Sequence, residues 1–324
     1  MKTRVMRTSA SVLTHRFEVG ETATDSTTAV TVTVTDPSGA TVASGTATHG
    51  ATGTYTYALP PQAALTVLAV AWSATIGGAA VVETDTVEVV GGFMFTLSEG
   101  RNSDASLADR DKYPTADLDA KRLEVEEECE RICDRSFVPR YARVTVDGSG
   151  SADLVLPHPD PDRTAAHVRT IRSVSMAQRS GGVPVAFTSA ELAALVVRGD
   201  SLVSRSDGLF WAEGYGNVVV EYEYGLDGPA LELKRAAMGR LRSLLNANKT
   251  GIPDRASSFT AGDGGTYRLD MPGAWKTGLP AVDAVYARYS RRSGAGAAGG
   301  RPIPASRTLD YDPQRNSLMH GGPR

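Results

Sequence analysis

The sequence is poor in the residues that build metal centres and disulfide frameworks. Its 324 residues include two cysteines, Cys129 and Cys133, and five histidines scattered along the chain. The cysteines lie four positions apart in a segment with helical periodicity, so their side chains share one helix face. A zinc site would need two further ligands, and none is near in sequence. We therefore expect both thiols to be small buried side chains, and we expect no bound metal or other cofactor.

The chain also lacks a strong excess of charge and a long hydrophobic run. Lys and Arg number 34 and Asp and Glu 37, which gives a formal net charge of -3 and argues against a protein that wraps DNA with basic stripes. The most apolar stretch, Ala63–Trp72, is half as long as the roughly 20 residues of a transmembrane helix. The first ten residues carry charges without the apolar centre of a signal peptide. These features predict no membrane partner.

Motifs of the common enzyme classes are missing as well. No His-Glu pair has the spacing of a zinc hydrolase helix, and no Gly-x-Ser-x-Gly elbow or Gly-rich dinucleotide motif follows a predicted strand. The segment 273–277 is only faintly similar to a phosphate loop, because Trp275 stands where glycine is needed before Lys276. The Arg-Gly-Asp tripeptide at 198–200 is ordinary turn chemistry between two short strands. We predict that the chain is not an enzyme.

Residues 1–92 are rich in threonine, which occupies 20 of these 92 positions. Val32 and Val34 alternate with threonines, and so do Tyr55 and Tyr57, which is the period of a half-buried strand. Turns are predicted at 36–39, 60–61 and 77–78. About seven short strands at this spacing predict an immunoglobulin-like β-sandwich.

Three helices are predicted after residue 92. They cover about 115–135, with Thr115 as the cap, about 229–247, and about 280–290. The first two have apolar stripes that require a partner, so we expect them to pack together. The face of the first helix that carries glutamates 124, 127, 128 and 130 is expected to be solvated. The side chains expected to pack this core are Leu118, Val125, Cys129, Ile132, Phe137, Leu231, Met238, Leu241 and Leu245.

A strand-rich insertion at about 141–224 separates the two main helices, and a basic arm follows the third. The arm begins with a Gly- and Ala-rich linker, and the 34 residues from Arg291 onward contain six Arg and two Asp. Fully extended at ~3.3 Å per residue, it would reach on the order of 100 Å. The sequence thus predicts an α+β multidomain chain, with a sandwich at 1–92, a helical core at 93–292 and an extended arm at 293–324.

Four blocks, in this order, resemble the head-to-tail adaptor proteins of long-tailed phages of actinobacteria. They are YPTADLDAKRLEVEEECERICDRSFVPR at 113–140, EYEYGLD at 221–227, GIPDRASSF at 251–259 and TGLPAVDAV at 277–285. The resemblance covers about residues 93–292. The chain departs from compact members of the family in its threonine-rich N-terminal domain and in the long insertion.

The resemblance implies a structural protein of the virion neck, assembled in the host cytoplasm. Such adaptors form a ring, dodecameric in these phages, between the portal protein and a stopper or tail-completion protein. Genomic DNA passes through the lumen without sequence-specific binding. We expect the N-terminal domain to project outward, where it could contact capsid protein.

The arm is predicted to dock on the portal, as an added strand with apolar anchors. The residues expected to do so are Arg301, Pro302, Ile303, Pro304, Leu309 and Tyr311. A terminus that only adds solubility is the alternative interpretation of its composition.

A second hypothesis assigns the chain to another class of protein. In it, the chain is a virion decoration or host-surface protein that binds glycans through the N-terminal sandwich, and it would be a monomer or a trimer. Trp72, Tyr55 and Tyr57 are the aromatic side chains available there for stacking on sugars. Their strand positions favour packing inside the sandwich.

Overall fold

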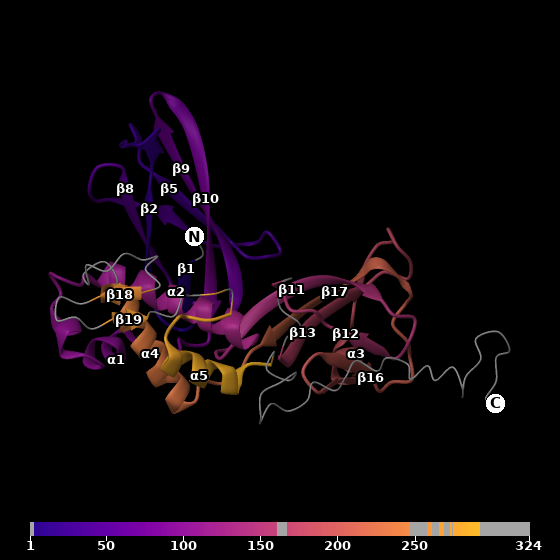
Figure 1. Ribbon diagram of the computed structural model, residues 1–324. Helices are drawn as coiled ribbons and strands as arrows, with labels where there is room; N and C mark the ends of the chain where they lie inside the picture. Colours follow the sequence, from indigo (N-terminus) through magenta and orange to yellow (C-terminus); the bar gives the residue numbers. More distant parts are fainter. Residues whose placement is uncertain are drawn as a thin grey trace.

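The computed structural model describes residues 3–160, 167–246, 258–260, 266–268, 273 and 275–291. The predicted fold class, α+β with an N-terminal sandwich, is confirmed (Figure 1). The sandwich stands above the place where a group of helices meets a second β-rich region, so three parts of the chain come together there.

The N-terminal sandwich consists of a five-stranded and a three-stranded sheet. In the larger sheet the order is β1 (Thr3–Met6), β10 (Ala79–Val90), β9 (Thr66–Ile76), β5 (Thr31–Thr35) and β6 (Thr41–Thr46). In the smaller sheet the order is β2 (Ser11–Arg16), β8 (Thr54–Leu59) and β7 (Thr48–His49), and β3 (Glu18–Val19) pairs with β4 (Thr22–Ala23). The first strand, β1, runs parallel to the last, β10.

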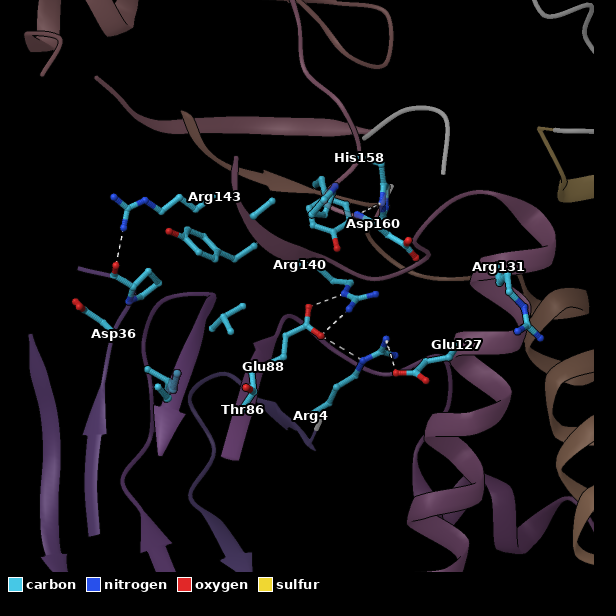
Figure 2. A pocket seen from close by; sticks show the side chains of 18 of the residues that line it. Arg4, Asp36, Thr86, Glu88, Glu127, Arg131, Arg140, Arg143, His158 and Asp160 are labelled. Carbon is cyan, nitrogen blue, oxygen red and sulfur yellow. Dashed lines mark hydrogen bonds and ion pairs between the residues drawn. The ribbon is translucent and has the colours of Figure 1, made fainter. Parts of the chain in front are cut away.

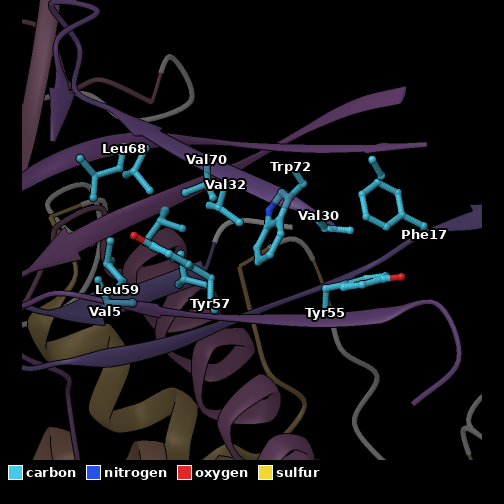
Figure 3. Close-up of a cluster of buried hydrophobic side chains, with 14 of the residues drawn as sticks. Val5, Phe17, Val30, Val32, Tyr55, Tyr57, Leu59, Leu68, Val70 and Trp72 are labelled. Atoms are coloured by element: carbon cyan, nitrogen blue, oxygen red, sulfur yellow. The ribbon is translucent and has the colours of Figure 1, made fainter. Parts of the chain in front are cut away.

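The period-two pattern places the larger apolar side chains between the two sheets. Val32 and Val34 are buried, whereas Thr31 and Thr33 on the opposite face of β5 are exposed. Figure 3 shows Trp72 of β9 among these side chains. The prediction that Trp72, Tyr55 and Tyr57 pack inside the sandwich is confirmed, because all three are buried in its core.

The turn between β9 and β10 depends on two glycines. Gly77 and Gly78 have φ values of 58° and 84°, and two consecutive positive φ angles are what a two-residue hairpin of the favoured twist requires. The predicted turn at 36–39 is also present. The Asp36 carboxylate accepts hydrogen bonds from the Ser38 and Ala40 amides at 2.9 and 3.0 Å.

The helical part consists of α1 (Leu97–Asn102), the 3-10 helix η1 (Ala105–Ala108), α2 (Thr115–Cys133), α4 (Leu231–Asn246) and α5 (Pro280–Tyr289). As predicted, α2 packs against α4, and both contact α5. Thr115 is the first residue of α2 and not its cap; Pro114 holds the cap position without a side-chain hydrogen bond. The helix ends at Cys133, and the C-cap residue Asp134 adopts the left-handed conformation with φ 55°.

The insertion contains two small sheets. One has the order β11 (Arg140–Gly148), β17 (Gly214–Tyr224), β13 (Val168–Met176) and β14 (Val185–Ala186). The other has the order β12 (Asp153–Val155), β16 (Leu202–Arg205) and β15 (Leu195–Arg198), and a short helix, α3 (Ser189–Ala193), precedes β15. Arg198 is the last residue of β15, and Gly199 and Asp200 lie in the turn between β15 and β16, with Gly199 at φ 64°. A further hairpin joins β18 (Ser258–Thr260) and β19 (Thr266–Arg268).

Candidate functional site at the junction of the three parts

Most side chains predicted to pack the helical core lie in one buried cluster. Six of them are buried there, namely Leu118, Val125, Cys129, Ile132, Phe137 and Leu241. Met238 and Leu245 are half-buried against the same cluster. Both cysteines are free and buried, as expected, with their Sγ atoms 4.0 Å apart.

The prediction for Leu231 is wrong, because its side chain is 62% exposed. The buried stripe of α4 is formed by Leu233, Ala237 and Leu241, which repeat every four residues. Each residue turns the helix by about 100°, so Leu231 lies about 200° from Leu233 and points to solvent. The predicted portal-docking residues, Arg301, Pro302, Ile303, Pro304, Leu309 and Tyr311, lie outside the described residues.

A group of five buried charged side chains occupies the junction between the sandwich, α2 and the insertion. We call it the junction cluster, and its members are Arg4 of β1, Glu88 of β10, Glu126 and Glu130 of α2, and Arg140 of β11. Charged side chains are seldom buried unless they are paired. The position of this cluster between three parts of the chain therefore makes it the candidate functional site.

Arg4 carries the connection from the sandwich to α2. Its Nη1 donates to Glu126 Oε2 at 3.2 Å and its Nη2 to Glu130 Oε2 at 3.5 Å. Its Nε lies 3.4 Å from Glu88 Oε2 on the neighbouring strand. Its Nη2 also lies 3.8 Å from Glu127 Oε1, so one guanidinium contacts four carboxylates from two parts of the chain.

Arg140 makes the second set of bonds and brings in the insertion. Its Nε and Nη2 donate to the two oxygens of Glu88 at 2.6 Å each, and its Nη1 donates to Glu130 Oε2 at 2.6 Å. Two parallel bonds between a guanidinium and a carboxylate are the strongest arrangement of this pair. Figure 2 shows Arg140 and Arg4 meeting on Glu88.

Each of the two α2 carboxylates also accepts a hydrogen bond on its second oxygen. Glu126 Oε1 accepts a hydrogen bond from the Met94 amide at 2.8 Å, and Glu130 Oε1 accepts one from Ser136 Oγ at 2.8 Å. Met94 belongs to the segment between β10 and α1, so Glu126 contacts the sandwich through Arg4 and this connecting segment through Met94.

The surroundings shift the pKa values of Glu126 and Glu88 in opposite directions. Burial raises the pKa of Glu126 to about 7, although the charge of Arg4 and the Met94 amide oppose this shift. Burial alone would also raise the pKa of Glu88, but the charges of Arg140 and Arg4 and the hydrogen bonds from Arg140 outweigh it, so that this pKa is lowered.

Other contacts fix the sandwich on the insertion. The Gly91 amide donates to the Pro139 carbonyl at 2.8 Å. Arg143 Nη1 donates to the Pro37 carbonyl at 2.5 Å, and Arg172 Nη1 donates to the Leu65 carbonyl at 2.6 Å. The sandwich is therefore attached to β11 and β13 of the insertion as well as to α2.

A cleft of about 1000 Å³ opens beside the junction cluster. Its walls come from all three parts, with Asp36 from the sandwich, Glu127 and Arg131 from α2, and His158 and Asp160 from the insertion (Figure 2). Acidic and basic side chains are interspersed along these walls. The adjoining carboxylates of Glu88 and Glu130 are held by guanidinium groups, which suits the site to joining parts of the molecule.

Within the part of the chain that the structure describes, no group of three or more His, Cys, Asp or Glu is placed to hold a metal ion. No helix among the described residues is long and apolar enough to cross a membrane.

Comparisons with known proteins add little to this picture. No protein-family model and no curated protein matches the chain. Among solved structures, CopC from Methylosinus trichosporium OB3b is 20% identical, with a TM-score of 0.22, over 27% of this chain and 82% of that one. A tetra-tandem repeat in the extending region of a large adhesion protein is 13% identical, with a TM-score of 0.20, over 68% of this chain and 50% of that one. At these TM-scores neither similarity bears on function.

The junction cluster was not predicted from the sequence. The glutamate-bearing face of α2 was expected to be solvated, but Glu130 is buried and Glu128 forms an ion pair with Arg240 at 2.7 Å. Glu124 and Glu127 on the same face are exposed, as predicted. Nothing in the local sequence distinguishes these glutamates, because the partners of Glu130 lie on distant strands.

Proposed function

We propose that the chain is a ring-forming head-to-tail adaptor in the neck of a tailed phage. One observation supports the proposal most: three sequence blocks that resemble these adaptors, although far apart in the chain, meet in the helical core. The Leu226 amide of the second block donates to the Ser136 carbonyl of the first at 3.1 Å. Val282 of the last block is buried in the same cluster as Leu118.

In this proposal the helical core and the insertion form the subunit contacts of the ring, which in the resembling phages is dodecameric. The portal binds on one side and a stopper or tail-completion protein on the other, and genomic DNA passes through the lumen. The arm after Gly300 binds the portal. The sandwich, held at a fixed position by the junction cluster, faces outward toward capsid protein.

The competing hypothesis, a glycan-binding decoration or host-surface protein, is weakened by the sandwich core. Trp72, Tyr55 and Tyr57 are buried, and a side chain must be accessible to stack on a sugar ring. The aromatic residues that suggested this activity are therefore occupied in packing.

Native mass spectrometry of the full chain, alone and mixed with the portal protein of the same particle, tests the proposal. The adaptor hypothesis expects a high-order ring in the mixture. A monomer or trimer that does not bind the portal protein and binds glycans would contradict it. Removing residues 293–324 tests the arm separately, and undiminished binding of the truncated chain to portal would contradict arm docking alone.

A further inference from the structure

The chain that leaves α5 is attached to the end of α2. Ser290 Oγ donates to the Ile132 carbonyl at 3.0 Å, and the Arg291 amide donates to the Cys133 carbonyl at 3.0 Å. The last four carbonyls of a helix have no partner within that helix. Residues 290 and 291 therefore satisfy two of these groups in α2 immediately before the arm begins.

The side chain of Arg291 extends this attachment to the insertion. Its Nη2 lies 2.8 Å from Asp200 Oδ2 and 3.2 Å from His167 Nδ1. The Arg291 side chain is 12% exposed, so it lies between α2 and the insertion and not in solvent. One residue thus joins the end of α5 to two other parts of the chain.

The two partners of Arg291 are positioned by bonds that do not involve it. The Val168 amide donates to the Asp200 carbonyl at 2.8 Å, and the Gly225 amide donates to the His167 carbonyl at 2.9 Å. His167 Nδ1 also lies 2.8 Å from Asp200 Oδ1. The insertion therefore presents a preformed pair of polar side chains to the residue that follows α5.

The charges near Arg291 show which partner matters most. Burial lowers the pKa of Arg291, and the Asp200 carboxylate is the largest of the charges that oppose this shift. Arg135 acts against the cation, and Asp134 acts in its favour. The C-terminal end of α2 also attracts positive charge. An arginine stays protonated in proteins, so Asp200 is the main partner of a permanent charge.

We propose that Asp200 and His167 form an anchor for the C-terminal arm, in which they hold Arg291 so that the arm leaves the molecule between α2 and the insertion. Asp200 is the last residue of the Arg-Gly-Asp tripeptide. Because its carboxylate is engaged within the chain, the tripeptide serves the arm and not an outside receptor. The anchor rests on the proposed adaptor function only for what the arm then binds.

A fixed starting point limits where the arm can bind. Arg301, the first residue predicted to dock, follows Arg291 by ten positions. A Gly-rich linker of ten residues spans about 17 Å on average. A partner bound by the arm should therefore contact the molecule close to the turn between β15 and β16.

Hydrogen exchange of the full chain, corrected for intrinsic rates, tests the anchor. Asp200→Asn removes the negative charge that faces Arg291, and Arg291→Gln removes the guanidinium. Each substitution should increase the opening equilibrium of the amides at 290 and 291 by about two- to fivefold. The double variant should show no larger increase than either single variant, because both substitutions break the same contact. The amides of Val125 and Cys129 in α2 are the internal reference.

Arg288→Gln is the matched control. Arg288 lies in the last turn of α5, is 61% exposed and pairs with Glu232 at 3.2 Å, so this variant should exchange at 290 and 291 as the wild type does. Wild-type exchange in Asp200→Asn, multiplied effects in the double variant, or an equal effect of Arg288→Gln would each overturn the anchor.

Crosslinking to the portal protein separates the anchor from the adaptor function. With p-benzoylphenylalanine in place of the exposed Arg198, the full chain should crosslink to the portal. With the same group in place of Val82, which is 64% exposed in the sandwich, it should not. Crosslinks from position 82 alone would contradict the fixed exit of the arm. A wild type that does not bind the portal would contradict the adaptor function, and hydrogen exchange would still decide the anchor.

Discussion

Arg140 of β11 and Glu88 of β10 are joined by two parallel hydrogen bonds of 2.6 Å, across 52 positions of sequence. The two residues belong to different parts of the chain, and Glu130 of α2 accepts a hydrogen bond from the same Arg140 guanidinium. The Arg140 side chain therefore contacts the sandwich and the helical core from the insertion, and it links all three parts.

Arg140→Met should destabilise the protein strongly. The substitution keeps most of the side-chain volume but removes a guanidinium that compensates the buried carboxylates of Glu88 and Glu130. Removing one partner of a buried ion pair costs about 3–5 kcal/mol. Urea unfolding would measure the loss. Arg16→Met is the control, since Arg16 and Glu18 form a half-exposed pair of the kind that contributes about 0–1 kcal/mol. Equal losses in the two variants would contradict this assignment.

Leu241 and Leu231 of α4 provide a matched test of the helical core. Leu241 is completely buried, whereas Leu231 is mostly exposed. We expect Leu241→Ala to lower the free energy of unfolding by about 2–5 kcal/mol through the cavity it leaves. Leu231→Ala should change it by less than about 0.5 kcal/mol. A larger effect at Leu231 in the isolated chain would contradict the exposure of its side chain.

Gly91 and Gly92, at the exit of β10, should respond differently to an added methyl group. A Cβ on Gly91 would lie 2.7 Å from the Cβ of Pro139, whereas one on Gly92 would meet nothing within 4 Å. Because the Pro139 ring is rigid, Gly91→Ala must displace the junction, at a cost of about 1–3 kcal/mol. Thermal unfolding of the two variants checks this, and indistinguishable midpoints would speak against the close approach.

Both cysteines should resist alkylation in the folded protein. Burial raises the pKa of the Cys129 thiol well above its usual range, and the reactive species is the thiolate. Iodoacetamide at about pH 8 should leave the native chain unmodified and add two groups after denaturation. Mass spectrometry gives the count, and rapid labelling of the native protein would mean that the α2–α5 interface opens readily.

Periodicity predicted the regular elements well, because each contains its own signal. The alternation at 31–35 and the apolar stripe from Leu118 to Ile132 both correspond to observed elements with the expected buried faces. The short helices α1 and α3 were missed although their start signals are present. Thr96 with Glu99, and Thr188 with Glu191, form capping boxes, a pattern visible in the sequence as Thr-x-x-Glu.

The junction cluster could not be predicted in the same way. Arg4 and Glu126 are 122 positions apart, and no local pattern relates a residue near the start of the chain to one face of a distant helix. The helix itself gave a misleading signal, because Glu126 and Glu130 look like part of a charged surface until the partners that cover them are in place.

The register of β10 also has a mechanical consequence. The strand pairs with β9 along Ala79–Val89 and passes directly into the segment that leads to the helical core. Ladder hydrogen bonds lie across the strands, so tension applied along β10 loads them in shear and they must rupture together. A load that separates the N-terminal sheets from the rest of the molecule thus meets the strongest direction of the ladder, unlike one that peels a strand away bond by bond.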